Sequence, residues 1–496
     1  MKTTQTGISQ EFWNQFVLNN WERESLAIKD SFINPPITSD GLFSLIVNNL
    51  NTNDESEEKV FLTFFIEGEK QEVEKTNFLL PKKEDTSFTA YDKRIRSAIN
   101  EQEYVLVIDS IKVNDFLWDW TYDFLQGLYK SLGYLSFGHF YSVFYGNYKV
   151  TPFGVHCHHV SKEAAFYFPI IGRKSMITWT PEFANKHPEL KGVRDYQKFL
   201  DGSSLIEAEP GGLMYWPSDI WHVGDSRGGD VSIVIAINAA DEFFRPLGYL
   251  ICKEIQSLYG DSLKGNLLKR IIQALTGWYF ILGSLNGIYE QRIQTLLAKH
   301  SNKYSKYIIK PIIKSFFWIL SIIPFQKSKT KAFFNPDDLQ ESAEKIPEAI
   351  RSAAMIFKGI VDSLIIERVT TKLWLRMLTC YGMCPITASQ FTLPKDEMLT
   401  VESCIQVYPK RVVIWRKVSE NEVWVAINGL LIRVPWHPIF PLIIKEINTG
   451  KVQSVKKMLE LSESTISRVD GNEYNIEDVL RFLETLLRYR GIKTVK

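Results

Sequence analysis

Short hydrophobic runs with strand-like composition dominate the first half of the chain. These runs combine β-branched and aromatic residues between turn-forming segments, which is typical of strands. They are Val60–Ile66, Tyr104–Ile108, Phe140–Tyr145, Ala164–Ile171 and Val231–Asn238. The last of them, VSIVIAIN, is almost wholly apolar, so we expect it to be buried on both faces. Residues 1–250 are therefore predicted to form a β-rich domain.

The hydrophobic pattern changes after residue 250. Leucine, isoleucine, lysine and glutamine recur at helical spacing, and strand signals become few. The predicted helical segments are Leu267–Ile281, Glu290–His300 and Ala343–Leu373. Residues 251–394 are therefore predicted to form an all-α region.

A third pattern begins near residue 395. Three short strand-like runs come first, namely Cys404–Tyr408, Val412–Arg416 and Glu422–Ala426. Three helix-like runs follow, namely Ile439–Asn448, Val452–Leu461 and Ile476–Arg488. Strands followed by short helices in about a hundred residues predict a small winged-helix-like domain over 395–496.

Composition indicates the number of domains and the cellular compartment, but it says little about the reaction. The 496 residues are long enough for two to four domains, and the formal net charge of +1 creates no general attraction to nucleic acid. The five cysteines are scattered and odd in number, which favours a reducing compartment over a disulfide framework. The N-terminal MKTTQTGISQEFW lacks the features of a signal peptide, so we expect a cytoplasmic protein. The uncharged run Ile271–Tyr289 contains many glycine and polar residues, so a buried helix is expected there and membrane contact is not.

The stretch GVHCHHV, residues 154–160, holds three of the eight histidines. In a strand, alternate side chains share a face, so His156 and His158 point together while Cys157 and His159 point the other way. Two imidazoles spaced this way on the inner wall of a barrel are able to bind one metal ion. The candidate for a third ligand is His222, in EPGGLMYWPSDIWHVGDS, where turns bracket a strand that re-enters the sheet.

Three segments in the same order resemble a known family. They are FWNQFVLNNWERESLAIKDSF, TPFGVHCHHV with FPIIGRKSMITW, and PGGLMYWPSDIWHVGDS with SIVIAIN. The region resembles the JmjC-type cupin oxygenases that use Fe(II) and 2-oxoglutarate, particularly the ribosomal-oxygenase branch. The resemblance implies an α+β fold: a double-stranded β-helix, then an all-α dimerisation region and a winged-helix-like domain. It also implies a homodimer.

The same resemblance assigns roles to individual residues. His156 would be the first iron ligand and His222 the last, while Lys174 would bind the distal carboxylate of 2-oxoglutarate. A lysine inside a barrel needs an anion beside it, which independently favours a carboxylate ligand. Further polar residues that the resemblance places in this pocket are Asn238, Thr151 and Tyr145.

The chain departs from the family at the second ligand. His158 stands where the family has the aspartate or glutamate of its two-histidine, one-carboxylate triad. Counting back from Lys174 gives a second alignment, with His159 as first ligand and Ser161 in place of the carboxylate. Glu163 is an alternative carboxylate ligand if the loop folds back. We favour the set His156, His158 and His222.

These observations predict a non-haem Fe(II) dioxygenase of the 2-oxoglutarate type that hydroxylates a peptide or protein side chain. The C-terminal segment also resembles small peptide-recognition domains, and it lacks the concentrated basic helix of a nucleic-acid reader. Two alternatives stay open: a cupin oxygenase that tailors a small molecule or natural product, and a catalytically silent JmjC-like scaffold that binds a partner.

Overall fold

The computed structural model describes most of the chain outside its central part. The described residues are 8–29, 35–51, 60–72, 76–132, 138–158, 163–226, 231–240, 250–251, 339–355, 363–380, 399–466 and 476–495. The chain divides into two compact units, residues 1–111 with 115–329 and residues 112–114 with 330–496. The helices expected at Leu267–Ile281 and Glu290–His300, and the uncharged run Ile271–Tyr289, lie outside the described residues. The three-domain division therefore stays a prediction.

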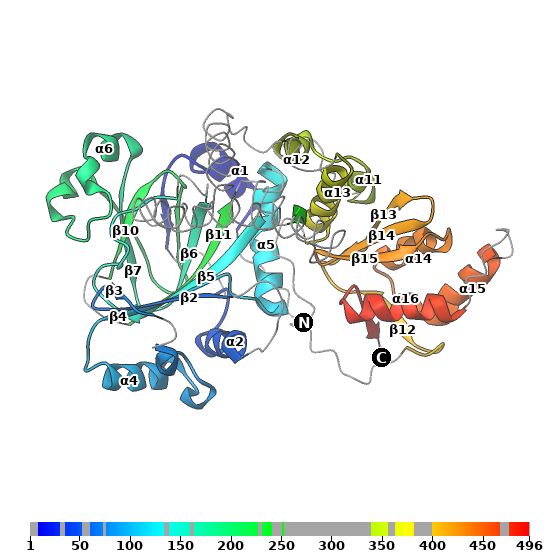
Figure 1. The fold of residues 1–496 in the computed structure, drawn as a ribbon, viewed down its shortest axis with the longest axis horizontal. Coiled ribbons are helices and arrows are strands. Elements are labelled where there is room, and N and C mark those ends of the chain that lie inside the picture. Colours follow the sequence, from blue (N-terminus) through cyan, green and yellow to red (C-terminus); the bar gives the residue numbers. More distant parts are fainter. Residues whose placement is uncertain are drawn as a thin grey trace, which may run out of the picture. The chain divides into compact units, whose positions relative to one another are not determined.

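Two antiparallel sheets form the first unit (Figure 1). The larger has the strand order β1-β9-β6-β11-β5-β4-β2-β3, and the smaller has the order β10-β7-β8. The strands of the larger sheet are β1 (Leu26–Ile28), β2 (Phe61–Ile66), β3 (Glu69–Lys70), β4 (Tyr104–Asp109), β5 (Gly138–Asn147), β6 (Glu163–Ile171), β9 (Leu213–Trp216) and β11 (Ser232–Ala240). Those of the smaller sheet are β7 (Lys174–Trp179), β8 (Ser204–Ala208) and β10 (Trp221–Asp225). The strand runs predicted in residues 1–250 all fall within these strands or one residue beyond their ends.

A shared apolar core joins the two sheets. Its buried members come from β6, β9 and β11 of the larger sheet and from β7 and β8 of the smaller one. They include Ala165, Tyr167, Met176, Ile206, Met214, Trp216, Val234 and Ala236. Because side chains alternate along a strand, these residues define the inward face of each strand. The two sheets therefore enclose one interior, as a cupin-like barrel requires.

Helices cover the outer face of the larger sheet. The helices of this unit within the described residues are α1 (Gln10–Asn19), α2 (Ser39–Asn51), α4 (Phe88–Ala98), α5 (Asp115–Leu132) and α6 (Pro181–Lys186). Trp13 of α1 and Phe124 of α5 pack edge to face at 5.1 Å, and Phe124 meets Phe166 of β6 at 5.5 Å. Phe166 alternates with the inward Ala165 and Tyr167, so α1 and α5 lie on the outer side of β6.

The second unit combines small sheets with helices. Its sheets have the orders β16-β12-β17 and β13-β14-β15. The strands are β12 (Cys404–Val407), β13 (Ile414–Ser419), β14 (Glu422–Ile427), β15 (Leu430–Pro435), β16 (Gln453–Ser454) and β17 (Ile492–Val495). The helices are α11 (Leu339–Glu344), α12 (Glu348–Ala354), α13 (Ser363–Thr379), α14 (Ile439–Asn448), α15 (Val455–Ile466) and α16 (Ile476–Arg488). The winged-helix-like assignment stays a prediction.

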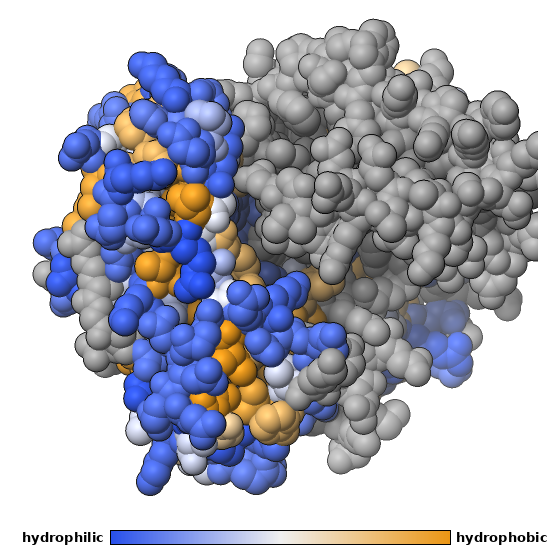
Figure 2. Space-filling view, turned by 60° about the vertical axis from the view of Figure 1, so that its left-hand side comes forward, coloured by the Kyte–Doolittle hydropathy of each residue, from blue (hydrophilic) through white to orange (hydrophobic). Residues whose placement is uncertain are grey.

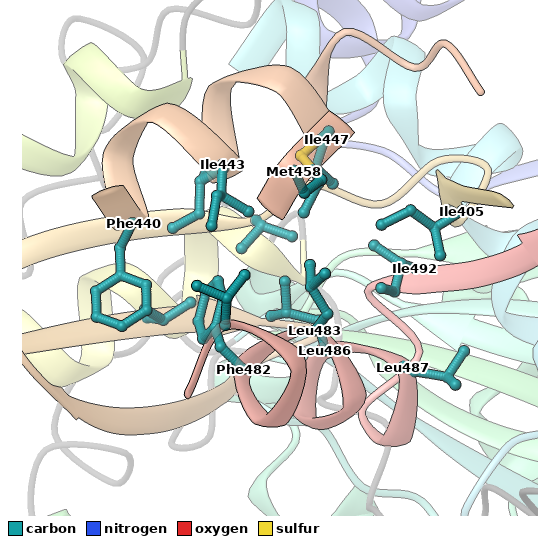
Figure 3. Packing of buried hydrophobic residues seen from close by; sticks show 14 of the residues in the cluster. Ile405, Phe440, Ile443, Ile447, Met458, Phe482, Leu483, Leu486, Leu487 and Ile492 are labelled. Carbon is teal, nitrogen blue, oxygen red and sulfur yellow. The ribbon is translucent and has the colours of Figure 1, made fainter. Parts of the chain in front are cut away.

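One hydrophobic core holds the second unit together (Figure 3). Phe440 and Ile443 of α14 meet Phe482 and Leu483 of α16, and Ile405 of β12 closes the cluster. Phe440 and Phe482 lie 4.7 Å apart between ring centroids. The apolar spacing that predicted α14 and α16 thus matches the faces that these helices bury.

The described surface seen in Figure 2 is largely hydrophilic, with a few hydrophobic patches. This distribution fits a chain whose large apolar residues are mostly packed in the two cores. Among the described residues, no helix is long and apolar enough to cross a membrane.

Candidate metal and carboxylate site

Three histidines converge inside the first unit. One ring nitrogen from each of His156, His158 and His222 lies within 4.8 Å of the other two. The ring centroids of His156 and His222 are 4.4 Å apart, and that of His158 lies 5.4 and 5.2 Å from them. The structure therefore brings together the set of three that the sequence favoured.

Backbone pairing explains why these side chains meet. His156 and His222 form an isolated antiparallel bridge in which each N–H donates to the other's carbonyl, at 3.0 and 2.7 Å. Directly paired residues point to the same side. His158 is anchored separately, since its N–H donates to the Ser218 carbonyl at 2.9 Å. The segment pairs through this bridge and these contacts and is not a regular strand, but the expected alternation still holds across it.

Gly154 allows the histidine segment to approach its neighbour closely. Its φ of +66° lies in the left-handed region, and a Cβ there would sit 2.4 Å from the Gly192 carbonyl oxygen. Beside it, Val155 donates to Val193 and accepts from Gly192. A side chain at position 154 would thus displace the segment that carries His156.

Local hydrogen bonds orient two of the rings. The Nδ1 atoms of His156 and His222 each lie 2.9 Å from a backbone carbonyl, those of Gly154 and Ile220. A carbonyl only accepts, so each Nδ1 carries the proton and donates it. The Nε2 atoms of both rings are then left as lone-pair donors, which is the form that binds a metal ion.

Burial keeps these imidazoles neutral. Burial and the neighbouring His158 lower the pKa of His156 to about 4. Burial, followed by the nearby His156 and His158, holds the pKa of His222 well below its ordinary value. Neutral imidazole is the metal-binding form, so at neutral pH these two rings need no deprotonation step before a cation binds.

This burial predicts how the stability of the metal-free protein depends on pH. The pKa of His156 is about 4 in the folded chain against an ordinary 6.5, so between these values the unfolded chain binds a proton that the folded chain does not. The free energy of unfolding should therefore fall as pH drops through this window, by about 1.4 kcal/mol per pH unit from this group. Urea unfolding of the metal-free protein and of His156→Asn at pH 7 and pH 5 measures the difference. An equal loss of stability in both proteins would contradict the expectation.

Lys174 faces the same interior from the neighbouring strand. On β10 and β7, His222 pairs with Thr178 and Gly224 pairs with Met176, so Lys174 shares their face. A Cβ on Gly224 would lie 3.2 Å from Lys174 Nζ. The ammonium therefore lies beside Gly224, two residues or about 7 Å along β10 from His222.

Lys174 is buried among hydroxyl groups. Its side chain is 1% exposed. Its Nζ donates to the hydroxyl of Tyr148 and lies 3.4 Å from Ser226 Oγ, and it sits 4.2 Å from the centre of the Tyr148 ring. Within the described part of the chain, no carboxylate lies within ion-pair distance of this ammonium. A buried cation with neutral partners alone is costly, so the pocket is suited to an anionic ligand.

A glycine places Lys174 at this position. The chain crosses from β6 to β7, and so from one sheet to the other, through Gly172. Gly172 has a φ of +71°, and a Cβ there would lie 2.5 Å from the Val231 carbonyl oxygen. Only glycine fits this crossing without displacing residue 231.

Two other predicted residues lie on the interior side. Thr151 is 5% exposed, and its hydroxyl accepts from the Gly224 N–H at 3.0 Å, next to Lys174. Asn238 is 4% exposed and donates to Ser142 Oγ at 2.9 Å. Asn238 alternates with the inward Ala236 and Val234, so it belongs to the inner face of β11.

Tyr145 lies away from this site. It stacks on Phe88 at 5.1 Å and lies 5.1 Å from Tyr91, both on α4, and its hydroxyl accepts from that of Tyr104 at 3.0 Å. Figure 1 shows α4 below the strands of the larger sheet. The neighbouring Phe144 packs on the inner core, so Tyr145 points outward. The expectation that Tyr145 lines the pocket is therefore wrong, because its position has the opposite strand parity.

The alternative ligands divide into two groups. His159 and Ser161 lie outside the described residues. Glu163 lies beyond His158, with its Oε2 at 3.4 Å from His158 Nδ1. Glu163 thus lies beside the Nδ1 atom of His158, and Nε2 is the ring nitrogen on the opposite side.

Sequence reasoning missed several polar groups around the site. Tyr148 and Ser226 contact Lys174, and Asp109 and Ser142 lie near Glu163 and Asn238. Burial, together with the charge of Glu163, raises the pKa of Asp109, while a hydrogen bond from Ser142 opposes this rise. Strand alternation could have indicated Ser142, which shares a face with Phe144. Tyr148 follows the end of β5, so strand alternation does not predict which way its side chain points.

The donor set fits a divalent transition metal. Three neutral imidazoles suit iron, zinc, copper or nickel, at about 2.0–2.1 Å for a bond to zinc. The nitrogens already lie within 4.8 Å of one another, so small rotations of the rings bring them to one ion. Three protein ligands leave further positions for small molecules, as catalytic metal sites require.

Comparisons with known proteins give weak matches. No family profile and no curated protein matches the chain. The ribosomal oxygenase YcfD from Escherichia coli is similar in structure at 12% identity and a TM-score of 0.43, over 99% of both chains. A second structure of YcfD, in complex with cobalt and 2-oxoglutarate, matches at 11% identity and a TM-score of 0.42 over 98% of both chains. A mutant of Bacillus subtilis oxalate decarboxylase matches 33% of the chain and 34% of its own at a TM-score of 0.16 and 11% identity.

YcfD is a ribosomal oxygenase, the branch that the sequence motifs resemble.

Proposed function

We propose that this protein is an Fe(II)-dependent oxygenase of the 2-oxoglutarate type that hydroxylates a side chain of a peptide or protein. One observation carries the proposal. Three imidazoles placed to bind one metal ion and a buried lysine that has no carboxylate beside it among the described residues face the same interior, with His222 and Lys174 on one face of the strand pair β10–β7. A metal ion and an organic anion therefore have adjacent places inside the barrel.

The histidines would hold the iron through Nε2 atoms. His222 is 2% exposed and packs against Trp216 at 5.1 Å, which limits the access of water from that side. When bound, Fe(II) supplies the reaction with O2 and with the 2-oxo acid. The protein's role would be to present nitrogen ligands and to fix their orientation through the carbonyls of Gly154 and Ile220. It would also leave coordination positions of the metal open.

Lys174 would hold the far end of the co-substrate. A short dicarboxylic acid with one end at the metal reaches along β10 toward Gly224, where the ammonium lies. An ion pair there would compensate the cost of burying Lys174. The Tyr148 and Ser226 hydroxyls beside Nζ offer hydrogen bonds to the same carboxylate. This geometry favours a co-substrate with two anionic ends over a neutral molecule.

The second unit supports a peptide substrate. In the sheet β13-β14-β15, the amide of Gln340 covers one edge by bonding both the N–H and the carbonyl of Trp415. At the other edge of the sheet lies β15. Within the described part of this unit, β15 pairs with β14 on its inner side and with no strand on its outer side. A free edge accepts an extended peptide as an added strand. The homodimer through residues 251–394 stays a prediction.

Turnover of the co-substrate tests this function. Protein loaded anaerobically with Fe(II) is mixed with 2-oxoglutarate and air-saturated buffer, with and without a pool of peptides and folded proteins. We expect succinate above background, raised severalfold by the pool, with a mass increase of one oxygen atom in one component. Mass spectrometry identifies the modified component.

Other results would redirect the proposal. Succinate stimulated by small metabolites and never by peptides would support the tailoring alternative. Iron uptake with no 2-oxoglutarate consumption under any condition would refute the proposed co-substrate. Failure to bind iron at all would leave the scaffold alternative.

A further inference from the structure

His158 differs from the other two ligands in the group that its Nδ1 faces. The Nδ1 atoms of His156 and His222 meet backbone carbonyls, which are neutral acceptors. His158 Nδ1 instead lies 3.4 Å from the carboxylate of Glu163, which is an ion-pair distance, and the two groups are not aligned as a hydrogen bond. His158 is also the residue that stands where a carboxylate ligand was expected from the sequence.

We propose that Glu163 is a positioning residue that acts on the metal through His158. When the metal is bound, a rotation of the His158 ring would turn Nδ1–H toward the carboxylate and Nε2 toward the metal, and Glu163 would supply the negative charge that three neutral imidazoles lack. This inference rests on the proposed metal site and adds a charged group to it. The site thus keeps an acidic residue, which contacts the ligand His158 instead of the metal itself.

The position of Glu163 suits this role. It is the first residue of β6, directly paired with Ala240 of β11 and on the same face as the inward Ala165. Its side chain is 12% exposed and that of His158 is 20% exposed. Water therefore screens their interaction far less than it would at the surface. Asp109 lies close enough to influence the same charges, and a hydrogen bond from Ser142 holds it.

The expected effect on the metal follows from charge. A cation bound by three neutral rings keeps its full charge, whereas a direct carboxylate ligand would cancel part of it. A carboxylate that accepts the Nδ1–H of a ligand histidine makes that imidazole a stronger donor and fixes its tautomer. Loss of such a partner commonly weakens metal binding by about 10- to 100-fold.

Cobalt(II) binding to the full-length chain tests the inference. Calorimetry gives the affinity, and the visible absorption of the bound ion reports its ligand field independently of activity. We expect Glu163→Gln to weaken Co(II) binding by about 10-fold or more and to shift the visible bands. Glu207→Gln is the matched control, because Glu207 is a carboxylate on β8 that pairs with Arg173 and is 25% exposed. Its affinity and spectrum should equal those of the wild type.

The outcomes separate this inference from the proposed function. Wild-type affinity and spectrum in Glu163→Gln, with binding lost in His222→Ala, would overturn the role of Glu163 and leave the metal site standing. No Co(II) binding by the wild type would refute the proposed function itself.

A measurement on the unaltered chain covers the case in which Glu163→Gln does not fold. In Zn(II)-loaded protein with ¹⁵N-labelled histidine, we expect His158 to show a metal-bound Nε2 and a protonated Nδ1 whose proton is shifted downfield by the carboxylate. A His158 that binds zinc through Nδ1, or that stays unbound, would overturn the inference.

Discussion

Replacing His222 with alanine should remove metal binding, with an affinity loss of more than about 100-fold and no measurable turnover. A ligand contributes more than the surrounding groups that orient it, whose loss already costs about 10- to 100-fold. His222 is central to the cluster, since it pairs with His156 through the backbone and lies near both other rings. Elemental analysis after Fe(II) loading and calorimetry with Co(II) measure the change.

The control for this substitution is another histidine of the same unit. His187→Ala removes a partly exposed ring that lies near Glu189 and outside the cluster. It should bind metal as the wild type does. Metal content that stays at one ion per chain in His222→Ala would contradict the ligand assignment.

Replacing Lys174 with methionine should weaken 2-oxoglutarate binding and at the same time stabilise the ligand-free protein. A hydrogen bond to a charged group contributes about 1.5–3 kcal/mol, so the dissociation constant should rise about 10- to 100-fold. Methionine has a similar volume and removes a buried ammonium that is 1% exposed, so the free energy of unfolding should rise by about 1 kcal/mol or more. Calorimetry and urea unfolding measure the two effects.

Opposite signs for binding and stability separate this role from a structural one. Lys149→Met, at a side chain that is 76% exposed, should change neither quantity appreciably. A Lys174→Met protein that is less stable, with unchanged 2-oxoglutarate affinity, would show that Lys174 serves the fold.

Hydrophobic patterning predicted much of the first unit, because its strands are long and buried on one or both faces. The run Val231–Asn238 lies within or next to β11, which pairs with both β5 and β6. Two helices of the second unit, α14 and α16, have the predicted bounds. These helices have strong apolar stripes that one core buries.

Two features of the second unit differ from the prediction, although the sequence contains a local signal for each. The expected helix Ala343–Leu373 contains Pro347, which lacks an N–H, and α12 begins just after it. Strand β15 was not predicted, although Asn428 and Gly429 both have positive φ in the turn before it. An Asn-Gly pair between two apolar runs is a strong hairpin signal, so this strand was recoverable from the sequence.

The site shows the limit of reasoning along one chain. Strand alternation correctly predicted that His156 and His158 point to one side, because that depends only on their spacing of two residues within one extended segment. The position of Tyr145 depends on the parity of β5, which its neighbour Phe144 reveals only once the core is known. The contact between Glu163 and His158 depends on how the chain returns between two sheets, and no spacing in the sequence contains that information.

The central claim is that His156, His158 and His222 bind one metal ion beside an anion held by Lys174. Anomalous diffraction from a crystal loaded with Co(II) and 2-oxoglutarate tests it most directly. We predict one cobalt peak at about 2.0–2.2 Å from the three Nε2 atoms and a carboxylate of 2-oxoglutarate at hydrogen-bond distance from Lys174 Nζ. A cobalt ion bound by Glu163 or His159 in place of His158, or 2-oxoglutarate away from Lys174, would contradict the account.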